Sequence, residues 1–131
     1  MMNSGTTIPP GLDCLVRIED GIAIAELAGE LDLARAPALR EQLLGLLRTG
    51  KSRLILDLSQ VSFCDASGLA VLVGTGHRAR RQGGFQRLAA VSPQVARVLN
   101  LTGLHRHLPV FPTIQAAAAG TPASQRSRAA A

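Results

Sequence analysis

The chain has 131 residues, of which 47% are hydrophobic, so its length and composition fit one domain with a packed core. Aromatic residues make up only 2%, with no Trp and no Tyr, and the core is therefore expected to be aliphatic. The formal net charge is +5, but the cationic residues are scattered and have no aromatic neighbours to stack on bases, so no nucleic-acid partner is expected.

The sequence gives no sign of export or membrane insertion. Residues 1–10 are polar and lack the basic and apolar regions of a signal peptide, and no segment reaches the about 20 apolar residues of a membrane span. The protein is therefore expected in the cytoplasm, where Cys14 and Cys64 stay reduced. Their spacing suggests no metal site, no cofactor is expected, and Cys64 is predicted to be a small buried thiol.

The first predicted elements form a hairpin. Residues 1–11 are predicted to be a disordered leader. Residues 12–19 contain a short alternating stretch, 15–18, that suits a strand, and the run 22–27 is the second predicted strand. The Asp20-Gly21 pair between them is typical of a tight turn.

A helix is predicted after a turn at residues 29–32. Asp32 is its expected N-cap, Pro37 lies in its first turn, and Gly50 ends it. One apolar stripe with helical spacing runs along it, formed by Leu39, Leu43, Leu46 and Leu47. The short apolar run 54–58 is predicted to be a buried strand, followed by a loop over residues 59–65.

A second helix is predicted to start near Ser67 and to end at Gly83-Gly84. A strand at 85–91 follows it. A third helix is then predicted with Ser92 as its cap and Pro93 at its first position, closed by Gly103. The segments 108–111 and 114–119 suggest a last short strand and a weak helix. Residues 120–131 are predicted to be a disordered, basic, Ala-rich tail.

This order of elements predicts an α/β fold over residues 12–119. The sheet is expected to be mixed and mostly parallel, with 4–5 strands packed against 3–4 helices. Asp32 and Asp65 each follow the carboxyl end of a predicted strand. Because ligands and partners of such sheets meet that edge, the two carboxylates are expected to share one functional face.

Four segments resemble a known family. Residues 61–69 read VSFCDASGL, residues 29–32 read GELD, Gly83-Gly84 precedes a strand, and residues 92–104 contain SPQV and LTGL. In this order they resemble the STAS domains of bacterial anti-sigma factor antagonists, whose signature loop reads roughly F-x-D-S-[ST]-G-L. The resemblance runs from about residue 12 to residue 115.

The resemblance implies a regulatory binding protein. In the family, the unphosphorylated antagonist sequesters an anti-sigma factor, commonly a serine kinase with a histidine-kinase-like ATPase fold, and so frees a sigma factor. Phosphorylation of the signature loop ends the interaction, and a serine phosphatase restores it. The positions that match this partner-binding loop, together with the aspartate of the first turn, are Asp32, Asp65, Ala66, Ser67 and Gly68.

The sequence departs from the family at the phosphoacceptor. That position is Ala66, which has no hydroxyl, so Ser67 is the candidate phosphorylation site. A phosphate beside Asp65 would add about −1.5 to −2 charge and repel a fitted partner. Three hypotheses stay open: Ser67 is the acceptor, the antagonist is constitutively competent, or the fold serves another role. Ser67 or Asp65 is alternatively only a helix cap, and Gly68 only a close-packing residue.

Two other classes of function are alternatives to this prediction. The first is a STAS accessory subunit of an ABC-type membrane lipid-transport complex, which needs no phosphoserine. The second is an enzyme, but His77 lies more than two helical turns from Ser67, and His105 and His107 have no evident partner. No catalytic activity is therefore expected.

Overall fold

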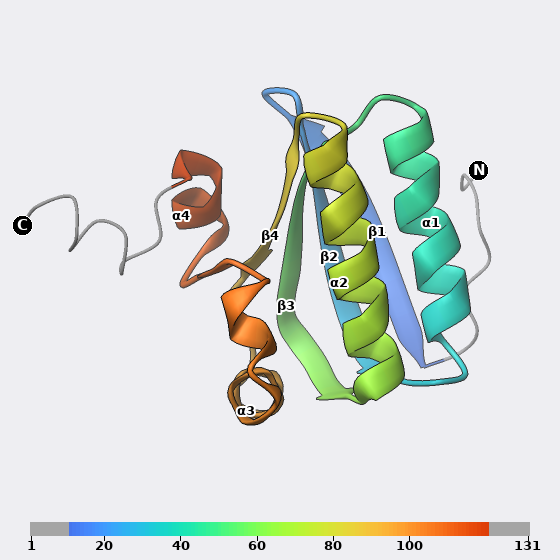
Figure 1. Cartoon of the computed structure of the whole chain (residues 1–131), viewed down its shortest axis with the longest axis vertical. Helices are drawn as coiled ribbons and strands as arrows, with labels where there is room; N and C mark the ends of the chain where they lie inside the picture. Colours follow the sequence, from blue (N-terminus) through green and yellow to red (C-terminus); the bar gives the residue numbers. More distant parts are fainter. Residues whose placement is uncertain (1–10, 121–131) are drawn as a thin grey trace, which may run out of the picture.

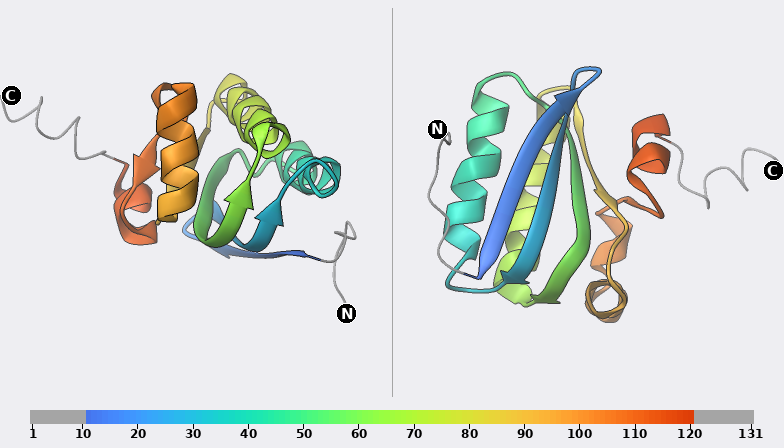
Figure 2. Two further views of the ribbon diagram at one scale, coloured as in Figure 1. Left: turned by 90° about the horizontal axis from the view of Figure 1, so that it is seen from below. Right: turned by 180° about the vertical axis from the view of Figure 1, so that it is seen from behind.

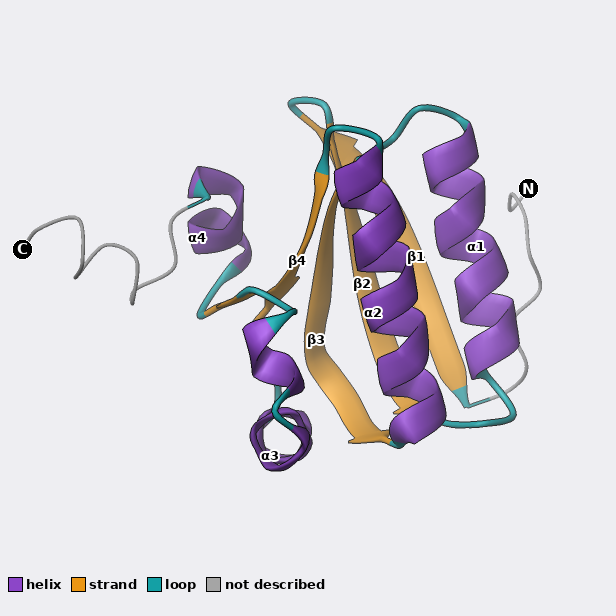
Figure 3. Ribbon diagram, in the orientation of Figure 1, coloured by secondary structure: helices purple, strands orange, loops and turns teal. Residues whose placement is uncertain are grey.

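The computed structural model describes residues 11–120. These residues contain five strands, four α-helices and one 3₁₀ turn: β1 (Leu12–Glu19), β2 (Ile22–Leu31), α1 (Ala36–Arg48), β3 (Arg53–Cys64), α2 (Ala66–Arg81), β4 (Phe85–Ala89), α3 (Pro93–Thr102), η1 (Leu104–Arg106), β5 (Val110–Phe111) and α4 (Ile114–Ala119). The α/β fold and its predicted order of elements are confirmed (Figure 3).

The strands form one sheet in the order β1-β2-β3-β4-β5. β1 is antiparallel to β2, and all other neighbours are parallel. Asp20 and Gly21 connect β1 to β2 with φ angles of 51° and 78°, which are the positive values that a two-residue hairpin turn of type I′ requires. The predicted hairpin and its turn are therefore confirmed.

Helices cover both faces of the sheet, but unequally. α1 and α2 lie side by side across one face, and α3 and α4 lie at the β4–β5 side of the molecule (Figures 1 and 2). Ala25 and Leu56 belong to the cluster that contains residues of α1 and α2, whereas their neighbours Ile24 and Ile55 pack with Ala117 of α4. Successive strand residues point to opposite faces, so α4 covers the face opposite to α1 and α2.

The core is aliphatic, as the composition predicted. Leu39 and Leu43 of the predicted α1 stripe are fully buried, Leu47 is almost so, and Leu46 is partly buried. Phe111 is the one phenylalanine among the buried core residues within 11–120. Each fully buried leucine contributes roughly 1.5–3 kcal/mol through the apolar area it removes from water.

Two strands extend further than the sequence predicted. β2 continues through Gly29 to Leu31, so the predicted turn at 29–32 begins too early, and β3 continues to Cys64 through the predicted loop 59–65. The pairing of β2 with β3 shifts register twice in this region. These irregularities interrupt the alternation of apolar and polar residues that identifies a strand in a sequence. The polar residues at the end of β3 therefore looked like a loop.

The predictions for the two chain ends fall almost wholly outside the described residues. Of the leader predicted at 1–11, Gly11 is described, and its carbonyl accepts a hydrogen bond of 2.8 Å from the Glu30 N–H. Of the tail predicted at 120–131, Gly120 is described and follows α4. Within residues 11–120, no helix is both long and apolar enough to cross a membrane.

Candidate functional site

The turns that hold Asp32 and Asp65 lie next to each other at one end of the sheet. Leu31 and Cys64, the last residues of β2 and β3, are paired in the parallel ladder, and the Asp65 N–H donates to the Leu31 carbonyl at 3.2 Å. The left view of Figure 2 shows the two strands ending side by side. The expectation that both aspartates share the carboxyl edge of the sheet is confirmed. We call this end of the sheet the signature edge.

Asp65 joins the two turns. Its backbone is extended at the N-cap of α2, where Oδ1 accepts a 3.1 Å hydrogen bond from the Gly68 N–H. Oδ2 accepts a second 3.1 Å bond from the Leu33 N–H, in the connection between β2 and α1. One carboxylate therefore satisfies an unpaired N–H at the start of α2 and also fixes the neighbouring loop. The alternative in which Asp65 caps the helix is confirmed.

Asp32 is not the N-cap of α1, so that prediction was wrong. Arg35 occupies the N-cap position, without a side-chain cap, and Pro37 lies in the first turn. Asp32 Oδ1 instead accepts from the Arg35 N–H at 3.1 Å, and Oδ2 pairs with the Arg35 guanidinium at 2.5 Å. This turn of three residues separates Asp32 from the helix. The hydrogen bond from the Arg35 side chain lowers the pKa of Asp32.

Gly68 has the close-packing role that was considered for it. A Cβ built at Gly68 would lie 2.5 Å from the Leu31 carbonyl oxygen, 2.6 Å from Leu31 Cγ and 3.0 Å from Cys64 Sγ. No other residue fits without movement of the backbone. Glycine therefore lets the first turn of α2 sit directly against the ends of β2 and β3.

Ala66 and Ser67 form the first turn of α2. Ala66 is exposed, Ser67 is half-buried, and neither caps the helix, because Asp65 does so. The alternative in which Ser67 is only a cap is thus wrong. Cys64 beneath them is a buried free thiol, as predicted. Burial, followed by the negative charge of Asp65, raises the pKa of Cys64 to about 12.

The sequence reasoning missed two exposed apolar side chains at the signature edge. Leu33 follows Asp32 and is 72% exposed, and Phe63, in β3 opposite Glu30, is 42% exposed. Their exposure could have been predicted because neither residue belongs to an apolar stripe: Leu33 precedes the helix, and Phe63 falls in the segment predicted to be a loop.

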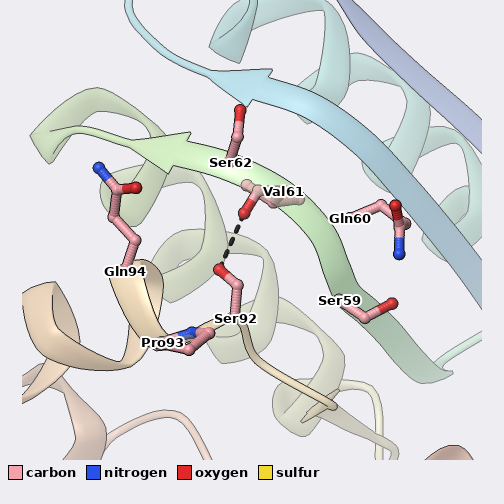
Figure 4. A pocket seen from close by; sticks show the side chains of 7 residues that line it. All are labelled: Ser59, Gln60, Val61, Ser62, Ser92, Pro93 and Gln94. Carbon is pink, nitrogen blue, oxygen red and sulfur yellow. Dashed lines mark hydrogen bonds between the residues drawn. The ribbon is translucent and has the colours of Figure 1, made fainter.

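A shallow hollow of about 440 Å³ lies beside the signature edge (Figure 4). It separates the last part of β3 from the start of α3, because the pairing of β3 with β4 stops at Asp57 and Ala89. The Ser92 hydroxyl donates to the Val61 carbonyl at 2.8 Å instead of capping α3. The hollow is lined by uncharged residues, namely Ser59, Gln60, Val61, Ser62, Ser92, Pro93 and Gln94.

The side chains at the signature edge are suited to binding a partner. Across 11–120, no cluster of three or more His, Cys, Asp or Glu side chains is arranged to hold a metal ion. His105 lies after α3, where its Nδ1 is 3.3 Å from the Leu99 carbonyl oxygen, and His77 is exposed on α2. What the edge presents is a fixed pair of loops with two carboxylates and exposed apolar groups.

Comparisons with known proteins agree with this geometry. Residues 14–117 match the STAS domain family. The chain is 41% identical over 78 residues to an anti-sigma-B factor antagonist of Bacillus subtilis, covering 60% of this chain and 71% of that protein. It is 30% identical over 112 residues to an anti-sigma-F factor antagonist of Mycobacterium tuberculosis, covering 86% and 91%.

A solved structure has the same fold. The crystal structure of an anti-sigma factor antagonist from Mycobacterium paratuberculosis superposes with a TM-score of 0.73 at 31% identity, covering 82% of this chain and 91% of that one. The family match spans most of the chain, and the curated relatives are matched over more than two thirds of their own length. The chain therefore belongs to the STAS domain family and, within it, to the anti-sigma factor antagonists.

Proposed function

We propose that the protein binds an anti-sigma factor at its signature edge through Asp32, Asp65, Ala66, Ser67 and Gly68. Sequestration of that factor releases a sigma factor for transcription. The observation that carries this proposal is the double hydrogen bonding of Asp65, which holds the β2–α1 and β3–α2 loops as one surface. A surface that is ordered before binding loses little conformational entropy when a partner docks on it.

The partner we propose is a cytoplasmic anti-sigma factor of the serine-kinase type with a histidine-kinase-like ATPase fold. A serine phosphatase would restore the antagonist where it is phosphorylated. The relatives are named as antagonists of anti-sigma factors, which supports a regulatory binding protein over both an enzyme and an accessory subunit of a lipid-transport complex.

Ser67 is the proposed phosphorylation site. Ala66 has no hydroxyl, and Ser67 is the next residue in the first turn of α2, half-buried and two positions after Asp65. A phosphate on Ser67 would place about −1.5 to −2 charge next to Asp65, and the repulsion and the desolvation of that charge would remove the partner.

Binding is tested by isothermal titration calorimetry between the full chain and ATPase-fold anti-sigma factors from the same genome. We expect a one-to-one complex for the wild type and a loss of affinity of tenfold or more for Asp65→Ala, because both loops lose their common anchor. Glu41→Gln, at an exposed site on α1, is the control and should bind like the wild type. No complex with any such factor would refute the proposal.

Phosphorylation is tested separately. The complex is incubated with ATP, and phosphopeptides of the wild type and of Ser67→Ala are compared by mass spectrometry. Modification that is present in the wild type and lost in Ser67→Ala assigns the switch to Ser67. Modification at another residue, or none, overturns that assignment and leaves the binding result intact.

A further inference from the structure

Three exposed apolar residues lie close to Asp65 at the signature edge: Phe63 and Ala66 are near it along the chain, and the Leu33 N–H bonds to its carboxylate. Leu33 and Phe63 are two of the six exposed large hydrophobic side chains in residues 11–120. Ala66, between Asp65 and Ser67, is also exposed. The other four lie on β1, α3 and β5, away from this edge: Leu15, Ile18, Leu101 and Val110. We call Leu33, Phe63 and Ala66 the apolar patch.

Each member of the apolar patch is attached to a fixed backbone. The Leu33 N–H is held by Asp65 Oδ2, Phe63 is paired with Glu30 in the β2–β3 ladder, and Ala66 is the first residue of α2. Exposed apolar groups on fixed backbone lose little freedom when they are buried by a partner. In typical protein interfaces a few well-packed, buried side chains supply most of the affinity.

The charges around the apolar patch are mainly negative. Glu30, Asp32 and Asp65 border it, and the guanidinium of Arg35 pairs with Asp32 and lies 3.8 Å from Glu30. An anionic border favours a partner whose contact surface carries Lys or Arg. The methyl group of Ala66 also suits an apolar pocket, because its burial leaves no polar group unpaired.

We propose that the apolar patch inserts into an apolar pocket of the anti-sigma factor and that the rim of this pocket is basic. The inference rests on the proposed function and specifies the partner surface that would recognise this chain. It also gives the alanine at the acceptor position a role: its methyl group becomes part of the contact.

Matched leucine and phenylalanine variants test the insertion. Dissociation constants for the anti-sigma factor are measured for the wild type, Leu33→Ser and Phe63→Ser, with Leu101→Ser as control, since Leu101 is 76% exposed on α3. We expect about tenfold weaker binding or more for Leu33→Ser and Phe63→Ser, and less than about twofold for the control. Thermal melts of all variants establish that they are folded.

The outcomes separate this inference from the proposed function. A wild type that binds no anti-sigma factor contradicts the proposed function itself. A wild type that binds, with Leu33→Ser and Phe63→Ser as tight as Leu101→Ser, overturns the insertion and leaves the proposed function standing. If the wild type self-associates in analytical ultracentrifugation and Leu33→Ser is monomeric, a second copy of the chain covers the apolar patch. That outcome also overturns the proposed insertion into the anti-sigma factor.

The basic rim is tested with Glu30→Gln, which removes one bordering charge without loss of size. We expect its association rate constant for the anti-sigma factor to fall about two- to threefold at low salt, whereas Glu41→Gln on α1 should leave that rate unchanged. Equal rates for the two variants would contradict a basic rim.

Discussion

Both carboxylate oxygens of Asp65 accept structural hydrogen bonds, so removing the side chain should lower both the free energy of unfolding and the affinity for the partner. Oδ1 caps α2 at the Gly68 N–H, and Oδ2 holds the Leu33 N–H. Ser67, in contrast, does not cap the helix. The two residues lie in one signature loop, yet their side chains contribute differently to the fold.

We therefore expect Asp65→Ala to lower the free energy of unfolding by about 1–2 kcal/mol, which is the usual cost of a lost N-cap. Ser67→Ala, the matched control, should change it by less than about 0.5 kcal/mol. Urea denaturation followed by circular dichroism measures both values. Equal losses for the two variants would contradict the assignment of the cap.

Asp32 should titrate below the ordinary range for an aspartate. The hydrogen bond from the Arg35 side chain, with help from the Arg35 N–H, lowers the pKa of Asp32 in the folded state. The contribution of this interaction to the free energy of unfolding is therefore fully present above the unfolded-state pKa of about 3.9. It is lost as the pH falls through the folded-state pKa.

Carbon-detected NMR titration of the Asp32 side chain measures this pKa directly. We expect Arg35→Gln to return the pKa of Asp32 toward its ordinary value, because the charged donor is removed. The control is Arg40→Gln, an exposed site on α1 whose charge pairs with Glu41. A pKa of Asp32 that stays the same in Arg35→Gln would refute the stated cause.

At the scale of elements, an arginine of β4 contributes to holding α4 on the sheet. The Arg87 guanidinium lies over the Phe85 ring, with Cζ 3.5 Å from the ring centroid, and donates to the Ala117 carbonyl at 2.9 Å. Burial lowers the pKa of Arg87. A helix of six residues is too short to be stable alone, so this contact and the packing of Ala117 hold it on the sheet.

Arg87→Met should therefore loosen α4 and leave the signature edge unchanged. Hydrogen exchange followed by mass spectrometry is expected to show faster exchange in residues 114–119 of this variant, because methionine cannot donate to Ala117. Peptides from α1 serve as the internal reference. Unchanged exchange across α4 would show that apolar packing alone holds this helix.

At the scale of the whole molecule, charge is separated between the two ends of the sheet. The signature edge carries Glu30, Asp32 and Asp65 together with Arg35, whereas the last turn of α2 at the other end carries Arg78, Arg80 and Arg81. α2 begins at the signature edge and spans the length of the sheet between them (Figure 1). Such a charge distribution orients the molecule toward a basic partner and accelerates encounter.

We expect the association rate constant for the anti-sigma factor to fall several-fold between about 0.05 M and 0.5 M salt, with a smaller change in the dissociation rate. Stopped-flow measurements over a salt series provide both constants. A rate of association that does not depend on salt would contradict electrostatic steering toward the signature edge.

The sequence predicted the turns and helices that depend on interactions between residues close together in the chain. Asp20-Gly21 adopts positive φ angles, the leucine stripe of α1 has helical spacing, and the α4 segment was placed correctly. The shared edge of Asp32 and Asp65 also followed from the alternation of strands and helices, since parallel strands place their carboxyl ends together.

Only the tertiary structure decided which atoms join at that edge. The extension of β3 to Cys64 depends on pairing with β2, the bonds of Asp65 reach a loop 32 residues earlier in the chain, and the turn at Asp32 replaces the helix cap that its residue type suggested. The exposure of Leu33 and Phe63 depends in the same way on what packs around them. Contacts between residues distant in sequence set these features, and no local pattern contains them.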